Sequence, residues 1–221
     1  MLAAAELTYF DYCATSDKPS ILEFRQEFIR AWSDFTRNAL SHIGPAFPDA
    51  IKVELGNESP TLYVIWHFPE YPLLMHHLAK RNVIVAAAQD AEWLRPLAQV
   101  GLVANFSRME GLIALRRACE KGQSVAMMLD FCYEGTRNRV AKFLGLPCKT
   151  PSGLIELAHR FGLGVRLISI SDNLICTELV PSFVNDADDC LEWLNTKISG
   201  CIERDPTRWL LWPSLWSRVV R

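Results

Sequence analysis

The chain has 221 residues, of which half are hydrophobic and 22% are charged, and its formal net charge is −2. This composition is typical of a globular protein with one sizeable core. The near-neutral charge argues against a dedicated DNA-binding protein, which would usually carry a basic excess.

The hydropathy of the sequence predicts no transmembrane segment, because no run of about 18 apolar residues occurs. The first residues, MLAAAELTYFDY, contain an early Glu6 and no basic region, unlike a signal peptide. We therefore expect a cytoplasmic protein. Its seven cysteines are widely spaced and form no C-x-x-C motif. This spacing predicts reduced, mostly buried thiols and no metal site.

Hydrophobic periodicity predicts strands that alternate with helices along most of the chain. We expect helices at 20–42, 72–80, 90–100, 109–121, 151–161, 186–203 and 205–219. We expect strands at 51–55, 61–66, 83–87, 103–106, 124–129 and 140–144, and a hairpin of residues 165–171 and 174–180 around Asp172 and Asn173. The first of these helices opens on a capping box, Ser20 to Glu23, and should end near Gly44–Pro45.

The alternation predicts an α/β fold with a mixed, largely parallel sheet flanked by helices. We expect a single domain over residues 1–221. Residues 1–45 would form an N-terminal helical cap, and residues 46–221 would form the α/β core with the C-terminal helices.

Two polar residues stand directly after predicted buried strands. Residues 62–66 precede His67, and residues 124–129 precede Asp130. Ligands of open α/β sheets bind beyond the carboxyl ends of the strands, so we expect both side chains at one edge of the sheet. An imidazole can accept a proton from an attacking hydroxyl or amine, and a carboxylate can orient it. The alternative is structural, with a packed histidine and an aspartate that caps a turn.

Four blocks of sequence resemble, in order, motifs of the late acyltransferases of lipid A biosynthesis. These are lauroyl- and myristoyltransferase-like members of the lysophospholipid acyltransferase superfamily. HFPEYPLL (67–74) resembles the H-F-G-x-W-E-L block, and EKGQSVAMMLD (120–130) resembles the L-x-x-G-x-x-V … D strand. Residues 140–158 resemble the V-x-F-F-G-x-P … G … L-A segment, and DPTRWLLW (205–212) resembles the x-P-E-Q-W-L-W box. The resemblance spans about residues 60–218 and implies a glycerolipid-acyltransferase-like fold.

The resemblance implies an H-x4-D/E dyad, in which the histidine deprotonates an acceptor hydroxyl and the acid orients the histidine. The acceptor then attacks a thioester on an acyl carrier protein or coenzyme A. By position the histidine is His67, but the acid's place is taken by Pro72. Glu70 and Asp130 are the two candidates to replace that acid. If neither reaches the ring, His67 acts alone or the chain is not an enzyme.

The C-terminal block also departs from the family, because Pro213 follows Trp212 where the family has histidine and basic residues. A phosphorylated lipid A acceptor is therefore disfavoured. The resemblance then implies an acyl- or aminoacyltransferase, with His67 as general base. It would move an acyl group from a carrier-protein or coenzyme A thioester to an amine or hydroxyl of a small acceptor.

No bound cofactor is expected, because the thioester is a substrate. An acyl or peptidyl carrier protein is an expected partner. One alternative is a membrane-surface lipid acyltransferase of the lipid A type, with peripheral membrane contact. The other is a non-catalytic binding protein that kept the fold.

Further polar residues are candidate substrate contacts, each with a plain surface role as its alternative. Arg108 would suit a carrier phosphopantetheine or a substrate carboxylate. Cys132 lies close to Asp130 in sequence, so a Cys–His nucleophile pair is conceivable. The C-terminal tryptophans, Trp209 among them, are expected to pack, with an acyl groove as the alternative. The substrate-contact candidates are Asn105, Arg108, Tyr133, Glu134, Arg137 and Lys142.

Overall fold

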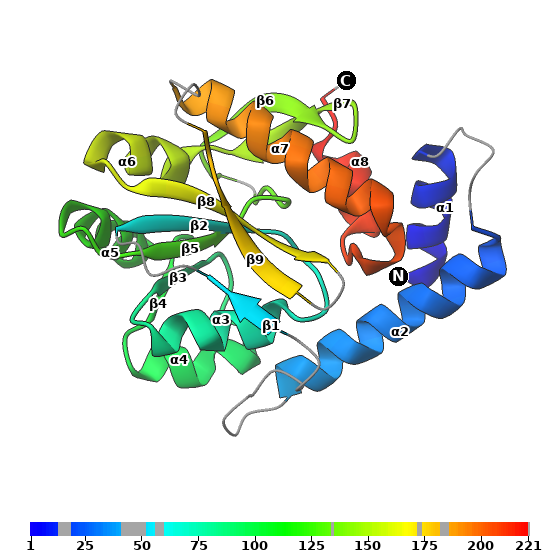
Figure 1. Ribbon diagram of the computed structural model, residues 1–221, viewed down its shortest axis with the longest axis horizontal. Coiled ribbons are helices and arrows are strands. Elements are labelled where there is room, and N and C mark those ends of the chain that lie inside the picture. Colours follow the sequence, from blue (N-terminus) through cyan, green and yellow to red (C-terminus); the bar gives the residue numbers. More distant parts are fainter. Residues whose placement is uncertain are drawn as a thin grey trace.

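The computed structural model describes residues 1–12, 19–40, 52–55, 60–133, 135–171, 174–181 and 186–220. Its centre is a seven-stranded sheet with the strand order β1-β9-β8-β2-β5-β3-β4 (Figure 1). β8, β2, β5, β3 and β4 are parallel to one another, whereas β9 pairs antiparallel with β8 and parallel with β1. The predicted α/β fold with a mixed, largely parallel sheet is therefore confirmed. The strands of this sheet are β1 (Lys52–Glu54), β2 (Thr61–Ile65), β3 (Ile84–Ala87), β4 (Val103–Asn105), β5 (Val125–Met128), β8 (Gly164–Ser171) and β9 (Leu174–Leu179).

Helices flank the sheet, and the longest of the N-terminal ones, α2, extends along one side of the molecule (Figure 1). The described residues form eight α-helices and three short 3-10 turns. The α-helices are α1 (Leu2–Tyr12), α2 (Ile21–Leu40), α3 (Tyr71–Lys80), α4 (Arg95–Gln99), α5 (Met109–Glu120), α6 (Gly153–Phe161), α7 (Ala187–Arg204) and α8 (Leu215–Arg218). The 3-10 turns are η1 (Glu92–Leu94), η2 (Pro206–Arg208) and η3 (Trp212–Ser214). None of the helices within the described ranges is long and apolar enough to cross a membrane.

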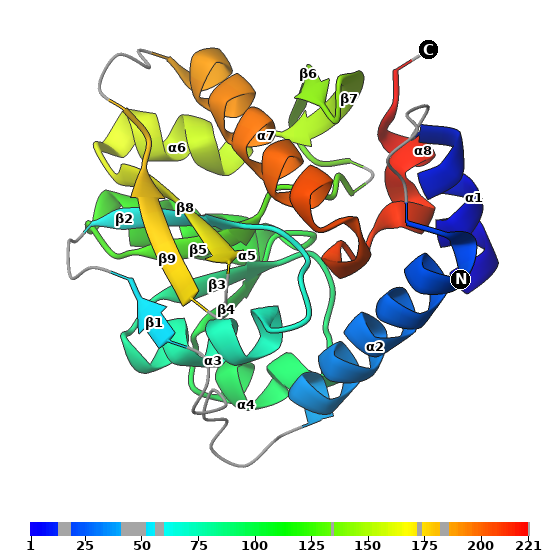
Figure 2. The same cartoon turned by 45° about the vertical axis from the view of Figure 1, so that its right-hand side comes forward.

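The N-terminal helices attach to the rest of the molecule through aromatic side chains. The Tyr9 ring of α1 stacks on Phe24 of α2, with centroids 4.4 Å apart, and meets Trp212 of η3 edge-on at 5.1 Å. Figure 2 shows α1 beside the C-terminal segment and α2 running towards α3. These contacts place the N-terminal helices against the segment that follows α7.

The capping box at the start of α2 is confirmed. The Ser20 peptide N–H donates to Glu23 Oε2 at 2.8 Å, and the Glu23 peptide N–H donates to Ser20 Oγ at 3.2 Å. Each side chain thus satisfies a peptide group that the first helical turn leaves free. The predicted stop at Gly44–Pro45 lies outside the described residues, as do Asp172 and Asn173 of the predicted hairpin tip.

One sequence prediction fails and one strand was not predicted, in both cases because of backbone chemistry. The predicted helix over residues 205–219 is wrong, because this segment forms η2, η3 and the four-residue α8. Pro206 and Pro213 each lack a peptide N–H and cannot sustain helical hydrogen bonding. The sequence also gave no hint of β7 (Leu146–Pro151), which pairs with β6 (Asn138–Phe143). Their two-residue turn places Leu144 and Gly145 at φ of 51° and 72°, as tight hairpins require.

The two central strands, β2 and β5, end level with each other. β2 is buried along its whole length, and its Ile65 is in register with Met128 of β5. The Leu129 peptide N–H donates to the Ile65 carbonyl at 3.0 Å, which extends the pairing to the ends of both strands. The residues that follow, His67 and Asp130, therefore leave the sheet at the same edge.

Candidate active site

His67 and Asp130 form a tight pair at the carboxyl edge of the sheet. His67 Nδ1 lies 2.7 Å from Asp130 Oδ1, and the His67 peptide N–H donates to Asp130 Oδ2 at 2.8 Å. Asp130 is fully buried, whereas the His67 side chain keeps 15% of its surface exposed. The predicted meeting of an imidazole and a carboxylate at one edge is confirmed as geometry.

The segment after α7 closes over the carboxylate. The Trp209 indole N–H donates to Asp130 Oδ2 at 2.8 Å, and the Leu210 peptide N–H donates to the His67 carbonyl at 3.1 Å. The buried Arg218 donates through Nη1 to the main-chain oxygen of Asp130 at 2.8 Å and lies over the Phe143 ring. Hydrogen bonds from residues 209–218 therefore hold both His67 and Asp130 in position.

The environment of Asp130 keeps its carboxylate ionised. Burial by itself raises the pKa of a carboxyl group, because desolvation penalises the charged form. Here the charge of His67, the hydrogen bonds from its ring and peptide N–H, and the Trp209 N–H outweigh burial and hold the pKa of Asp130 below its ordinary value. An ionised Asp130 accepts the Nδ1 proton of a neutral ring, so the lone pair of that ring lies on Nε2. Within the described part of the chain, Nε2 has no hydrogen-bond partner.

Tyr71 contacts the pair, and Tyr133 lies near enough to Asp130 to interact with it electrostatically. The Tyr71 ring meets the His67 ring edge-on, with centroids 5.1 Å apart, and stacks on Phe35 of α2. Burial raises the pKa of Tyr71, and the charges of Tyr133 and Asp130 raise it further. Burial and the charge of Asp130 also raise the pKa of Tyr133. Both phenols are therefore protonated near neutral pH and are hydrogen-bond donors, and Tyr133 is only partly buried.

Glu70, the other candidate acid, is bonded elsewhere. Its carboxylate accepts a hydrogen bond from Arg208 of η2 at 2.5 Å. Pro72 occupies the first turn of α3, where proline is favoured because no helical partner exists for an N–H. Among the described residues, the carboxylate bonded to the His67 ring is that of Asp130. The position of the expected acid thus starts a helix, and the acid comes from the neighbouring strand.

Asn105 and Arg108 are placed apart from the pair. Asn105 is the last residue of β4 and Arg108 follows that strand, and β3 separates β4 from β5 in the sheet. Asn105 Nδ2 donates to Asp90 Oδ1 at 2.8 Å, and Arg108 forms an ion pair with the same carboxylate. Asp90 and Arg108 each leave 64% of the side chain exposed. These residues satisfy one another on the surface and do not contact His67.

Most of the candidate residues after Asp130 also lie apart from the pair. Arg137 is exposed and forms an ion pair with Glu156 at 2.9 Å. Cys132 Sγ lies 3.5 Å from Thr136 Oγ1 and does not contact His67, so the Cys–His pair does not form. Lys142 is exposed on β6, and Glu134 lies outside the described residues. Tyr133 is the member of this group that is tied electrostatically to Asp130.

Trp209, Arg218 and Tyr71 are the site residues that sequence reasoning missed. Trp209 stands 79 positions from Asp130, so no spacing rule could pair them. The available signal was its place in the DPTRWLLW block, which resembles a family motif together with the His67 and Asp130 blocks. Tyr71, four residues after His67, gave no signal of its own.

Comparisons with known proteins give no match, either with a family model or with a curated sequence. Among the described residues, no group of three or more histidine, cysteine, aspartate or glutamate side chains could hold a metal ion. Support for a function therefore comes from the geometry of His67 and Asp130 and from the four resembling blocks.

Proposed function

We propose that the protein is an acyl- or aminoacyltransferase in which His67 is the general base and Asp130 orients it. The observation that carries this proposal is the 2.7 Å contact between a fully buried carboxylate and a partly exposed imidazole. Such an arrangement leaves one ring nitrogen to accept a proton, and the carboxylate stabilises the imidazolium that results. The donor is a thioester of a carrier protein or coenzyme A, as the four resembling blocks suggest.

The proposed reaction has two steps. The acceptor oxygen or nitrogen bonds to the thioester carbonyl carbon while its proton passes to His67 Nε2, and the carbonyl electrons form an oxyanion. Collapse of this tetrahedral species breaks the C–S bond. The departing thiolate takes the proton from Nε2, which restores the neutral ring and releases a free thiol. Asp130 stays ionised throughout and keeps the Nδ1 proton in place.

Tyr133 is the proposed donor to the oxyanion. Its phenol keeps its proton because burial and the charge of Asp130 raise its pKa, and its side chain is partly exposed. A donor aimed at a developing negative charge typically contributes more in the transition state than in the ground state. Tyr71 is more deeply buried and is proposed to hold the His67 ring in place.

The alternative of a non-catalytic binding protein was motivated by Pro72 in the acid's position. Pro72 is a weaker argument for this alternative, because Asp130 supplies a carboxylate at hydrogen-bonding distance from the His67 ring. A lipid acyltransferase of the lipid A type stays the weaker proposal, since Pro213 stands where the resembled family has basic residues.

The test is an assay of purified protein with acyl- and aminoacyl-thioesters of coenzyme A, pantetheine and a carrier protein. Small hydroxyl and amine acceptors are added together, and products are identified by mass spectrometry. We expect an ester or amide product, and His67→Ala should lower its formation by roughly 10²–10⁴-fold. His159→Ala, an exposed histidine on α6, is the matched control and should keep full activity.

Two outcomes would contradict the proposal. Full turnover by His67→Ala would show that His67 is not the general base. Release of free acid alone, with no acylated acceptor, would assign the pair to hydrolysis and make water the nucleophile.

A further inference from the structure

Arg218 is a buried cation that lacks an acid of its own. It keeps 2% of its surface exposed and, among the described residues, forms no ion pair. Its donors meet main-chain oxygens instead, those of Asp130 at 2.8 Å and Lys149 at 3.3 Å. Its Cζ lies 4.2 Å from the centroid of the Phe143 ring. Burying a charge costs free energy unless an opposite charge compensates it.

The C-terminal segment holds Arg218 in this place. Arg218 is the last residue of α8, and the next residue, Val219, forms an antiparallel bridge with Cys148 of β7. The Val220 peptide N–H then donates to the Pro147 carbonyl at 2.8 Å. The end of the chain is thus tied to the small β6–β7 sheet, and this attachment keeps the guanidinium beneath the main chain of Asp130.

The compensating charge for Arg218 is the Asp130 carboxylate. Burial lowers the pKa of Arg218, and the charge of Asp130 opposes this effect. The other titratable groups that act on the guanidinium are the thiols of Cys148 and Cys132. Burial raises the pKa of the Cys148 thiol, and the Cys132 thiol donates to the Tyr133 carbonyl at 3.9 Å, so neither offers a full negative charge. The guanidinium itself stays protonated, as arginine does in proteins.

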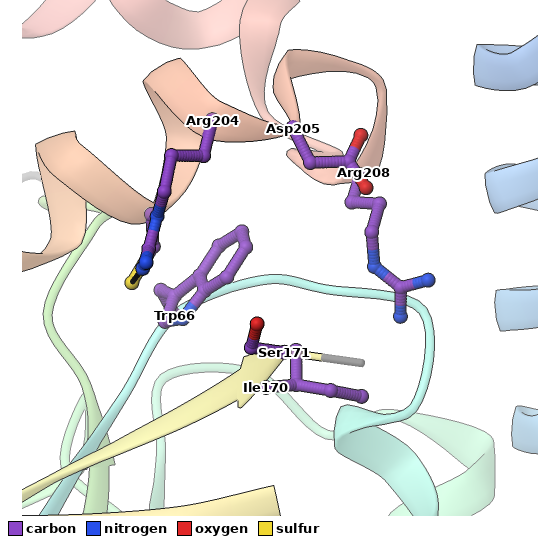
Figure 3. Close-up of a pocket in the computed structure, with 7 residues that line it drawn as sticks. Trp66, Ile170, Ser171, Arg204, Asp205 and Arg208 are labelled. Carbon is purple, nitrogen blue, oxygen red and sulfur yellow. Dashed lines mark hydrogen bonds between the residues drawn. The ribbon is translucent and has the colours of Figure 1, made fainter. Parts of the chain in front are cut away.

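Arg208, in the same C-terminal segment, has the ordinary surroundings of an arginine. Its guanidinium lies 2.5 Å from the carboxylate of Glu70, and its side chain keeps 31% of its surface exposed. Figure 3 shows Arg208 among the side chains that line a cavity beside Trp66. The charge of Arg208 is therefore cancelled by its own acid and partly solvated, whereas the charge of Arg218 is neither.

The buried charges around His67 decide whether its ring holds one proton or two. While the ring is neutral, Arg218 balances Asp130 and the buried set has no net charge. Tyr71 and Tyr133 do not alter this balance, because both phenols are protonated near neutral pH. Without Arg218, the carboxylate would favour an imidazolium, since a nearby opposite charge stabilises the charged form of a titratable group. A ring that already holds two protons cannot serve as a general base.

We propose that Arg218 is a positioning residue that acts on His67 through Asp130. Its hydrogen bond fixes the main chain of Asp130, and its charge balances the carboxylate, so that the His67 ring stays neutral and able to accept a proton near neutral pH. The proposal rests on the proposed role of His67 as general base. It assigns no contact with substrate to Arg218.

The test is an NMR titration of the full chain with 15N-labelled histidine, in which His67→Ala identifies the signals of the His67 ring. Arg218→Gln and Arg218→Met remove the charge, and in both the pH at which the ring takes up its second proton should rise by on the order of one unit. Arg218→Lys keeps the charge and should titrate like the unmodified chain. Arg117→Gln, which removes an exposed cation on α5, is the matched control and should also titrate like the unmodified chain.

The same shift should appear in the pH profile of kcat/KM for acyl transfer. Below the shifted midpoint, Arg218→Gln should be slower than the unmodified chain by up to about tenfold. At high pH, where the ring is neutral in both proteins, its rate should recover. A purely structural role of Arg218 would instead lower the rate at every pH.

Three results would overturn the proposal. The first is an unchanged ring titration in both neutral variants. The second is a shift in Arg218→Lys as large as that in Arg218→Gln, because the charge would then not be the cause. The third is failure of both neutral variants to fold, judged by circular-dichroism melts, which would assign Arg218 to folding alone. The titration needs no substrate, so full transfer by His67→Ala would refute the transferase proposal and leave the measured effect of Arg218 on the ring intact.

Discussion

Two pairs of neighbouring strands each end in an acid and a basic side chain, and the pairs differ in burial. After β2 and β5, His67 meets Asp130, which is fully buried. After β3 and β4, Asp90 meets Arg108, and both side chains are 64% exposed. An arginine stays charged and an exposed pair is screened by water, whereas a histidine beside a buried carboxylate can take and return a proton. Position at a strand end gives both pairs their geometry, but burial and the type of base distinguish them.

The largest expected effect comes from replacing each acid by its amide. In Asp130→Asn the amide nitrogen or oxygen must face three donors, from the His67 ring, the His67 peptide and Trp209. The ring loses its fixed proton position, so we expect acyl transfer to fall by roughly 10²–10⁴-fold. Asp90→Asn is the matched control at the other pair, and its turnover should be unchanged. Turnover is measured as kcat with the same thioester. Similar losses in both variants would show that the buried and the exposed pair do not differ in their role in transfer.

A smaller effect is expected from removing one indole N–H at a time. Trp209→Phe deletes a buried hydrogen bond to Asp130 Oδ2, and Trp212→Phe deletes a partly buried one to the Pro206 carbonyl. Both should lower the free energy of unfolding by about 1 kcal/mol, measured by urea denaturation. Only Trp209→Phe should also lower kcat, because only Trp209 touches the pair. An equal change of kcat in the two variants would mean that Trp209 acts through packing alone.

A smaller effect than that of the tryptophan variants is expected from pH. The lowered pKa of Asp130 predicts that its charge contributes to the free energy of unfolding in a pH-dependent way. Since the folded-state pKa lies below the ordinary value of 3.8, this contribution is fully present above pH 3.8 and is lost as the pH falls through the folded-state pKa. Urea unfolding across this range should therefore show a steeper acid loss for the unmodified chain than for Asp130→Asn. Parallel curves would show that the Asp130 charge does not stabilise the folded state.

Much of the fold was predictable, because burial and period leave a direct trace in the sequence. The strand-end positions of His67 and Asp130 followed from the two apolar runs that precede them. That β2 and β5 are neighbours was not predictable, since strand order depends on how the crossover helices pack. The predicted helix over residues 205–219 is wrong because its amphipathic pattern favours a helix that Pro206 and Pro213 interrupt. That error also concealed Trp209 and Arg218, whose contacts with Asp130 need the turns that those prolines impose.

The smallest expected effect is at the exposed pair, where Arg108→Gln removes the ion pair with Asp90 and keeps a polar side chain. An exposed ion pair contributes little, because water screens it and two long side chains must be ordered to form it. We expect the free energy of unfolding to change by less than about 0.5 kcal/mol and kcat to stay the same. A clear rise in KM for a carrier-protein thioester, with KM for the free pantetheine thioester unchanged, would instead place Arg108 on the donor's docking surface. That result would give the exposed pair a function in binding while leaving the chemistry with His67 and Asp130.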